Sequence, residues 1–386
     1  MVRRIDVSGE TVGYWNAMDE LMAKQFHKGM FEPTLVVMHW DSDQPCLDIG
    51  THEDADRIDF DHAREQGFAV GRRYAFAGGT AVHTPDFPNF MLYYRKPDTT
   101  ILAEADESGL ATVSGLESIG FSANYDSIGD VEIVKDDARV KVMAGSAATI
   151  HHPDLWVATM SIIWDFPPEG SILDDAVSIP EEKFQDKDTD SLTGRMQSLS
   201  SVLEELNIGV GKTTVLDAIT EANVEALLGP DEPIVESEWS NDERAFLETV
   251  APFFESDPWR NRVSTARMCR NVPPDTRLGQ AAYKSRKLIN VSVVLDDDDC
   301  ILDAIIGGDL YIRPHPTVTA GGALETIVEA VRGLEATDED ALEESIASVL
   351  DRPGTEAPGI SVEDFVAPIV RATENTQTVE RYLESQ

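Results

Sequence analysis

Cysteine and lysine are both scarce in this 386-residue chain. The three cysteines, Cys46, Cys269 and Cys300, are odd in number and widely separated. They therefore form neither a disulfide framework nor a metal-binding motif. Ten lysines are part of only 31 basic residues, against 71 acidic ones, and the net charge is −40. So anionic a chain is repelled by nucleic acid and by anionic membranes, and we expect neither as a partner.

Long apolar segments are also missing. No stretch approaches the roughly 18 apolar residues of a membrane-spanning helix. Arg3 and Arg4 are not followed by an apolar run, so we expect no signal peptide and a cytoplasmic protein. The acidic residues are spread along the whole chain. This pattern favours a halophile, in which salt screens the self-repulsion of the surface.

The chain nevertheless has the composition of a folded protein. Hydrophobic residues make up 42% of it, including six Trp and 14 Phe, which excludes a disordered acidic chain. At roughly 100–200 residues per domain, the length leaves room for two domains. We predict a boundary between 1–270 and 271–386, because Pro273 and Pro274 follow one expected helix and precede an independent strand pattern.

Helix and strand patterns are mixed along the chain without a regular alternation. Helical spacing of apolar residues predicts helices at 13–27, 191–206, 242–254, 324–334, 342–350 and 365–370. Apolar or alternating runs predict strands at 35–40, 46–50, 89–94, 131–134, 140–142, 155–166, 288–295 and 301–306. We expect an α+β fold whose mixed, mostly antiparallel sheet has flanking helices, followed by a small α+β C-terminal domain.

One stretch combines arginines with small residues. Residues 71–83 read Gly-Arg-Arg-Tyr-Ala-Phe-Ala-Gly-Gly-Thr-Ala-Val-His. Small residues let a backbone approach a ligand and expose its N–H groups, and arginine adds a fork of donors for phosphate or carboxylate. The spacing matches neither the GxxxxGK[ST] nor the GxGxxG loop. The stretch fits an anion-binding loop, or a turn between strands with two solvated arginines.

A second glycine-rich segment, Gly209-Val-Gly-Lys-Thr213, looks like the end of a P-loop. Leu206 stands where the first glycine of that motif belongs, and a predicted helix precedes the segment. We interpret it as a helix C-terminus with turn residues.

Several segments occur together in an order that is familiar from one family. They are Asn16, Asp19, Glu20 and Leu21, Cys46–Gly50, Gly67–His83, Asp130, Gly145-Ser146-Ala147, Lys183-Phe184, Ser191–Leu199, Tyr283-Lys284, Lys287-Leu288 and Gly308-Asp309-Leu310. In this order they resemble the lipoate–protein ligase family, within the wider biotin/lipoate ligase and octanoyltransferase fold. The resemblance covers most of the chain and includes the family's accessory C-terminal domain.

The resemblance also implies a set of site residues. Residues 67–83 would wrap an acyl chain and an adenylate. Lys141 would be the catalytic lysine, and no metal site is implied among the side chains. The implied substrate- and ATP-binding residues are Arg72, Arg73, Gly78, Gly79, Thr80, Ala81, His83, Asp130, Gly145 and Ser146.

This chain departs from the family pattern at the catalytic lysine. The family's Lys-x-x-Gly-Ser-Ala motif would place that lysine at Val142, and Lys141 is its neighbour. In a regular strand adjacent side chains point to opposite faces, so Lys141 would face away from the site. A β-bulge near Ala144 would re-phase the strand and aim Lys141 at the site. A second departure is Gly129, which replaces the asparagine of an Asn-Asp pair.

The implied reaction is ATP-dependent joining of lipoate, or octanoate, to a lysine of a lipoyl domain, by way of an acyl-adenylate. ATP and Mg²⁺ would be required. The acceptor would be the lipoyl domain of a 2-oxoacid dehydrogenase or a glycine-cleavage carrier protein. One alternative is an acyltransferase with a cysteine nucleophile, although no cysteine lies beside the glycine run or Gly145 in sequence. Another is a non-catalytic member that binds an acyl group, a lipoyl domain or a partner ligase. The sequence leaves all three open.

Overall fold

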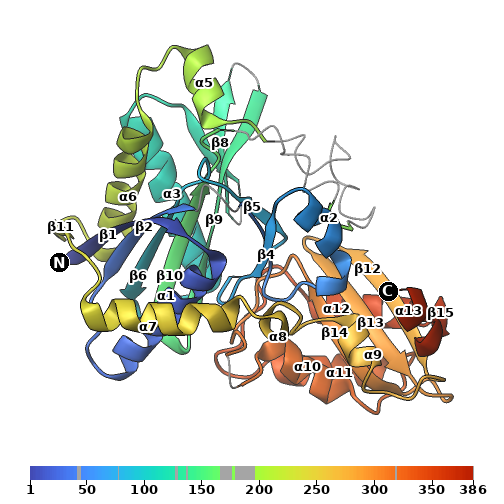
Figure 1. The fold of residues 1–386 in the computed structure, drawn as a ribbon. Helices are drawn as coiled ribbons and strands as arrows, with labels where there is room; N and C mark the ends of the chain where they lie inside the picture. Colours follow the sequence, from blue (N-terminus) through green and yellow to red (C-terminus); the bar gives the residue numbers. More distant parts are fainter. Residues whose placement is uncertain are drawn as a thin grey trace.

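The computed structural model describes residues 1–40, 45–76, 78–126, 129–135, 138–165, 176–178, 196–317 and 320–385. Its largest element is an eight-stranded sheet with the order β11-β1-β2-β6-β10-β9-β8-β7 (Figure 1). The strands are β1 (Val2–Glu10), β2 (Thr34–Trp40), β6 (Asn89–Arg95), β7 (Ala123–Asp126), β8 (Asp130–Lys135), β9 (Ala138–Ile150), β10 (His152–Ile162) and β11 (Ile234–Glu236). Only the β1 pairings with β2 and β11 are parallel, so the sheet is mixed and mostly antiparallel, as predicted.

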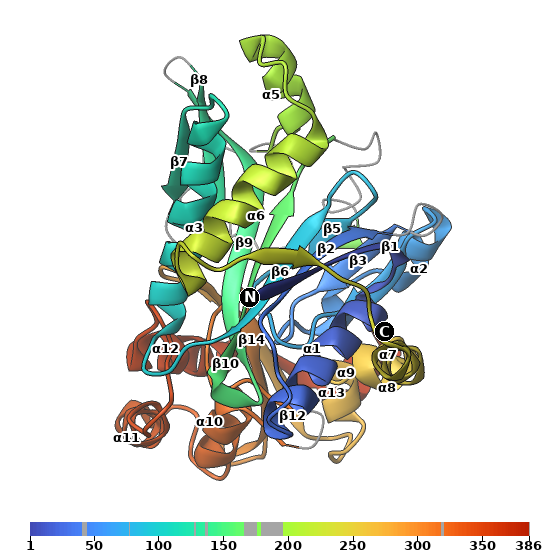
Figure 2. The same ribbon diagram turned by 90° about the vertical axis from the view of Figure 1, so that its left-hand side faces the viewer.

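Helices cover both faces of this sheet (Figure 2). One face packs on α3 (Ile101–Ser118), α5 (Leu199–Leu206) and α6 (Lys212–Leu228), and the other on α1 (Val12–His27), α7 (Asn241–Phe254) and α8 (Asp257–Arg260). Successive side chains of a strand point to opposite faces. Accordingly Leu35 belongs to the first core and Val36 to the second, and both are fully buried. A strand in the middle of the sheet, such as β2, must therefore be apolar on both of its faces.

A three-stranded sheet with the order β4-β3-β5 lies beside the large one. Its strands are β3 (Cys46–Ile49), β4 (Ala69–Arg72) and β5 (Ala81–His83), and the short helices η1 (Ala55–Arg57) and α2 (Phe60–Glu65) join β3 to β4. Leu47, Val70 and Val82 form its core together with Ile163, which follows β10. The loop between β4 and β5 contains the predicted glycine run.

The C-terminal part has its own four-stranded antiparallel sheet, with the order β14-β13-β12-β15. Its elements are β12 (Arg277–Lys284), β13 (Leu288–Leu295), β14 (Ile301–Gly308), α10 (Ala323–Val331), α11 (Glu339–Leu350), α12 (Val362–Ala372), β15 (Thr376–Thr378) and α13 (Val379–Ser385). The predicted hairpin and three helices are present, and β12, β15 and α13 were not predicted. The preceding helix α9 (Thr265–Cys269) packs with Leu278 and Tyr382 of this part. The boundary at residue 270 remains a prediction.

Two local predictions needed correction. The helix predicted at 191–206 begins only at Leu199. Met196 is not helical and forms a β-bridge with Lys141. Residues 191–195 lie outside the described residues. Residues 209–213 do follow the end of a helix, since α5 ends at Leu206 with Asn207 in the left-handed conformation. However, α6 begins at Lys212, and this helix was not predicted. Lys183, Phe184, Phe166 and the residues 136–137 between two predicted strands lie outside the described residues. No described helix is both long and apolar enough to cross a membrane.

Candidate active site

Arg72 lies at the end of β4 and is completely buried. Its Nε donates to the backbone carbonyl of Arg260 at 2.8 Å, and Nη2 to that of Val263 at 3.2 Å. Its Nη1 donates to the carbonyls of Gly50, Thr51 and Glu53, at 2.9, 3.2 and 2.8 Å. All three nitrogens are thus engaged with backbone. Arg72 ties three chain segments together, and this placement does not support the expectation that it binds an anion.

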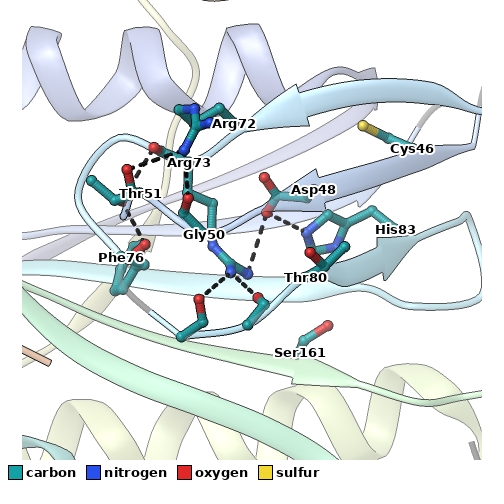
Figure 3. A network of polar contacts seen from close by, with 12 residues as sticks. Cys46, Asp48, Gly50, Thr51, Arg72, Arg73, Phe76, Thr80, His83 and Ser161 are labelled. Carbon is teal, nitrogen blue, oxygen red and sulfur yellow. Dashed lines mark hydrogen bonds and ion pairs between the residues drawn. The ribbon is translucent and has the colours of Figure 1, made fainter. Parts of the chain in front are cut away.

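Arg73 points towards the carbonyls of the glycine run instead (Figure 3). Its Nη2 donates to the carbonyl of Gly79, and Nη1 lies 3.5 Å from Asp48 Oδ2. The same carboxylate oxygen is 2.9 Å from His83 Nε2, and His83 stacks on Trp40 with a ring-centroid distance of 4.0 Å. Burial lowers the pKa of His83. The Arg73–Asp48–His83 group therefore holds both ends of the loop between β4 and β5.

Other polar contacts fix the first half of that loop. Asn16 in α1 donates from Nδ2 to the Arg72 carbonyl at 2.8 Å, and its Oδ1 accepts from the Tyr74 amide at 2.9 Å. Thr51 Oγ1 lies within 2.6 Å of the Phe76 carbonyl. Because these groups are buried and paired, the backbone of the loop is preorganised rather than free to collapse.

The second half of the loop depends on two glycines. Gly78 has φ +92°, a conformation that favours glycine. A Cβ added to Gly50 would lie 2.0 Å from the Gly78 carbonyl oxygen, so Gly50 must lack a side chain. Thr80 follows the run, and its hydroxyl donates to Glu53 Oε2 at 2.6 Å. Ala81 begins β5 and pairs with Asp48.

Lys141 lies beside a β-bulge. In the pairing of β8 with β9, Val131 is opposite Met143 but Glu132 is opposite Lys141, so Val142 is the extra residue. Both Val142 and Met143 are buried. The inserted residue reverses the alternation. Lys141 consequently lies on the same face as Asp130.

The result is an ion pair between two of the predicted site residues. Lys141 Nζ lies 2.7 Å from Asp130 Oδ1, and the two side chains are 22% and 30% exposed. Both groups thus remain accessible to a ligand. Asp130 is opposite Ala144 in the neighbouring strand, two residues before Ser146, so the three side chains point to one face. A bulge in β9 is present, as the second of our two strand alternatives predicts, but it lies at Val142 rather than near Ala144.

Gly129 and Gly145 form a close backbone contact next to this pair. The Gly145 amide donates to the Gly129 carbonyl at 2.6 Å. Gly129 has φ +106°, and a Cβ there would lie 2.1 Å from the Gly145 carbonyl oxygen. This chain therefore accepts only glycine where the family pattern has asparagine.

The C-terminal part contributes two residues that sequence reasoning missed. A Cβ at Gly78 would be 3.8 Å from both Asp309 Oδ1 and the Tyr311 hydroxyl. Burial raises the pKa of Tyr311 to about 12, with Asp309 adding to the increase and Ser146 and Arg73 opposing it. Tyr311 therefore lies between the glycine run and Ser146. Gly308-Asp309-Leu310 had indicated only the family, with no role.

The site retains polar atoms that the protein itself leaves unsatisfied. Arg73 Nε and Asp48 Oδ1 are buried and lack hydrogen-bond partners. Burial of such atoms costs free energy unless a ligand or a water molecule supplies the missing hydrogen bond. They fit a polar ligand with acceptor and donor groups. Among the residues that the structure describes, no group of three His, Cys, Asp or Glu side chains could hold a metal ion.

Comparison with known proteins identifies the family. The family model of the lipoyl protein ligase A/B catalytic domain matches residues 14–220. The chain belongs to this family. None of the curated proteins compared with it matches.

Three solved structures of lipoate ligases share the fold of this family member. The bipartite lipoate protein ligase of Thermoplasma acidophilum, studied with its E2 lipoyl domain, is 18% identical, with TM-score 0.54 over 68% of this chain and 96% of that one. A lipoate-protein ligase A bound with ATP is 17% identical, with TM-score 0.53 over 68% and 98%. Plasmodium falciparum LipL1 in complex with lipoate is 11% identical, with TM-score 0.64 over 96% and 100%. At these identities the likeness shows the fold alone.

Proposed function

We propose that this chain is a lipoate–protein ligase, which activates lipoate or octanoate with ATP and transfers the acyl group to a lysine of a lipoyl domain. The observation that carries the proposal is the bulge at Val142, because it brings Lys141 to the face of Asp130 and Ser146.

Activation would join a substrate carboxylate oxygen to the α-phosphorus of ATP as pyrophosphate leaves. In the second step the acceptor amine would attack the acyl carbonyl as AMP leaves. Two anions must approach in the first step, so fixed positive charge and N–H donors are needed. We assign Lys141 to hold the carboxylate and offset charge on the phosphate. The amides of Gly78–Ala81 and Arg73 would complete the anion site. Arg72 would act only indirectly, by holding the segments 50–53 and 260–263 in place.

Magnesium would accompany the nucleotide and neutralise phosphate charge. Mg²⁺ commonly takes one or two carboxylates, with phosphate oxygens and waters completing its shell. Asp130, beside Lys141, is a site carboxylate with suitable exposure for that role. The ATP-bound neighbour and the neighbour studied with a lipoyl domain support nucleotide use and this acceptor class.

The cysteine-nucleophile alternative gains no support from the structure. Cys46, the nearest to the site by strand pairing, is buried, and burial raises the pKa of its thiol. Burial also raises the pKa of Cys269 to about 11. The pKa of Cys300 is raised by desolvation and by neighbours such as Asp296. A reactive cysteine needs the opposite shift.

The decisive assay is lipoate-dependent exchange of labelled pyrophosphate into ATP, in high salt. We expect exchange in the native chain and its loss in Lys141→Met, with folding intact. Triple replacement of the cysteines by serine should leave exchange unchanged. Nucleotide binding without exchange would instead favour the non-catalytic alternative, and exchange surviving Lys141→Met would remove this lysine from the mechanism.

A further inference from the structure

A second cavity, of about 460 Å³, lies between the large sheet and the C-terminal part. One wall comes from Tyr74-Ala75 and the turn between β9 and β10, residues 149–153. The other wall comes from residues 313–317, the start of α10 and residues 352–355. Its lining includes Tyr74 and Ala75 from the start of the loop between β4 and β5, but not Arg73, Gly78, Asp130, Lys141 or Ser146. Its volume is in the range of small-molecule sites.

The lining of this cavity has an unusual charge for this chain. Of its 21 lining residues none is Asp or Glu, whereas two are Arg and three are His. With 71 acidic residues among 386, a random set of that size would hold about four. Two lining residues pair with acidic side chains that are not themselves part of the lining. Glu20 pairs with His151, and Glu356 pairs with Arg313. The lining itself nevertheless presents only neutral and cationic groups.

Several polar nitrogens of the lining lack hydrogen-bond partners. Arg313 is held by its Nη2, which donates to the Thr99 carbonyl at 3.0 Å, while its Nε and Nη1 are buried without a partner. His315 Nδ1 is likewise buried and unpartnered. His152 Nδ1 accepts from the Asp154 amide at 3.1 Å, so a neutral His152 carries its proton on Nε2. Arg352 is exposed at the rim. Buried donors without acceptors are rare in proteins unless a ligand supplies the acceptor.

We infer that this cavity binds a small organic oxyanion with an apolar body, a carboxylate or a phosphate ester. Arginine and histidine donors match the oxygens of either head group. Apolar residues such as Ile150, Pro153 and Val349 line the rest of the wall and match the body. A ligand there contacts both parts of the chain, so it stabilises their association. It also borders Tyr74, which directly follows Arg73 at the start of the glycine loop.

The test uses the full chain and needs no ligase activity. Benzoate and phenyl phosphate, titrated separately by calorimetry in chloride-free buffer, distinguish the two head groups. We expect saturable binding of at least one of them and a rise in the unfolding temperature. Arg352→Gln should weaken that binding about tenfold, the scale of one charge-assisted hydrogen bond. His152→Asn should do the same, because Asn retains an acceptor near the Nδ1 position but loses the Nε2 donor.

The matched control is Arg381→Gln, which removes an exposed arginine of α13 that lies outside the cavity lining. Binding should be unchanged in this variant. No heat or unfolding shift at millimolar probe would overturn the proposal, as would equal weakening by Arg381→Gln. Displacement of the probe by an equal concentration of chloride would reduce the cavity to a halide site and would also overturn it.

Discussion

Deletion of Val142 tests whether the register between β8 and β9 determines the face of the sheet on which Lys141 lies. Removing the extra residue leaves Val131 opposite Met143 and Glu132 opposite Lys141, which is already the observed pairing. The ladder becomes regular while the face of Lys141 stays the same. The reasoning therefore predicts that the 2.7 Å pair with Asp130, and with it pyrophosphate exchange, survives the deletion.

The expected change in stability follows from what Val142 contacts. Its side chain is fully buried in the first core, a burial worth about 1.5–3 kcal/mol. Its carbonyl also accepts a 2.9 Å hydrogen bond from the Ile163 amide, worth about 0.5–1.5 kcal/mol. The deletion should thus lower the free energy of unfolding by about 2–4.5 kcal/mol. That leaves a domain of ordinary stability folded.

A variant with residues 141 and 142 swapped provides the complementary test. Lys141→Val combined with Val142→Lys restores the spacing of the family motif but puts the lysine at a buried core position. Burying an unpaired charge is strongly unfavourable, so this variant should lose both stability and exchange. Urea unfolding and pyrophosphate exchange, in matched salt, measure the two effects. Loss of exchange in a folded deletion variant, or full exchange in the swapped variant, would refute the register argument.

Three further predictions concern the scaffold. Arg72→Lys should lower the free energy of unfolding by about 1 kcal/mol for each lost hydrogen bond, because one ammonium cannot serve carbonyls on two segments, 50–53 and 260–263. Arg73→Gln should instead mainly weaken nucleotide binding. Calorimetry on both variants measures these effects, and the reverse pattern would contradict the assignment. Burial lowers the pKa of His52 and His315 to about 3, so the unfolded chain binds protons first as the pH falls. Stability present above pH 6.5 should then decline by about 1.4 kcal/mol per pH unit for each histidine towards pH 3, and an unchanged slope in His52→Gln would contradict this. Gly129→Ala would put a side chain at a positive φ and against the backbone of Gly145. The unfolding temperature should fall by the equivalent of at least about 2 kcal/mol. An unchanged unfolding temperature would rule out the close contact between Gly129 and Gly145.

The order of secondary structure could be predicted largely from the sequence. Helix α1 and strands β2, β6, β13 and β14 follow from apolar residues at helical or alternating spacing, which is a local property. The family and the mixed sheet followed from the same segments. Helix α6 was missed because its N-terminal Gly209–Thr213 segment suggested only an ending. Buried tertiary contacts of Val215 and Ile219 stabilise it, whatever its flanking residues suggest.

The roles of the site residues depended on tertiary structure. Two adjacent arginines look alike in the sequence, but Arg72 meets carbonyls up to 191 positions away while Arg73 meets the loop that follows it. Likewise, the residues flanking Val142 give no sign of a bulge, because a bulge is a mismatch between two strands and only the partner strand defines it. Tyr311 reaches the glycine run from the segment that follows β14 in the C-terminal part. Sequence spacing determines which face a residue takes within its own element; which groups meet across elements is determined by packing of the whole chain.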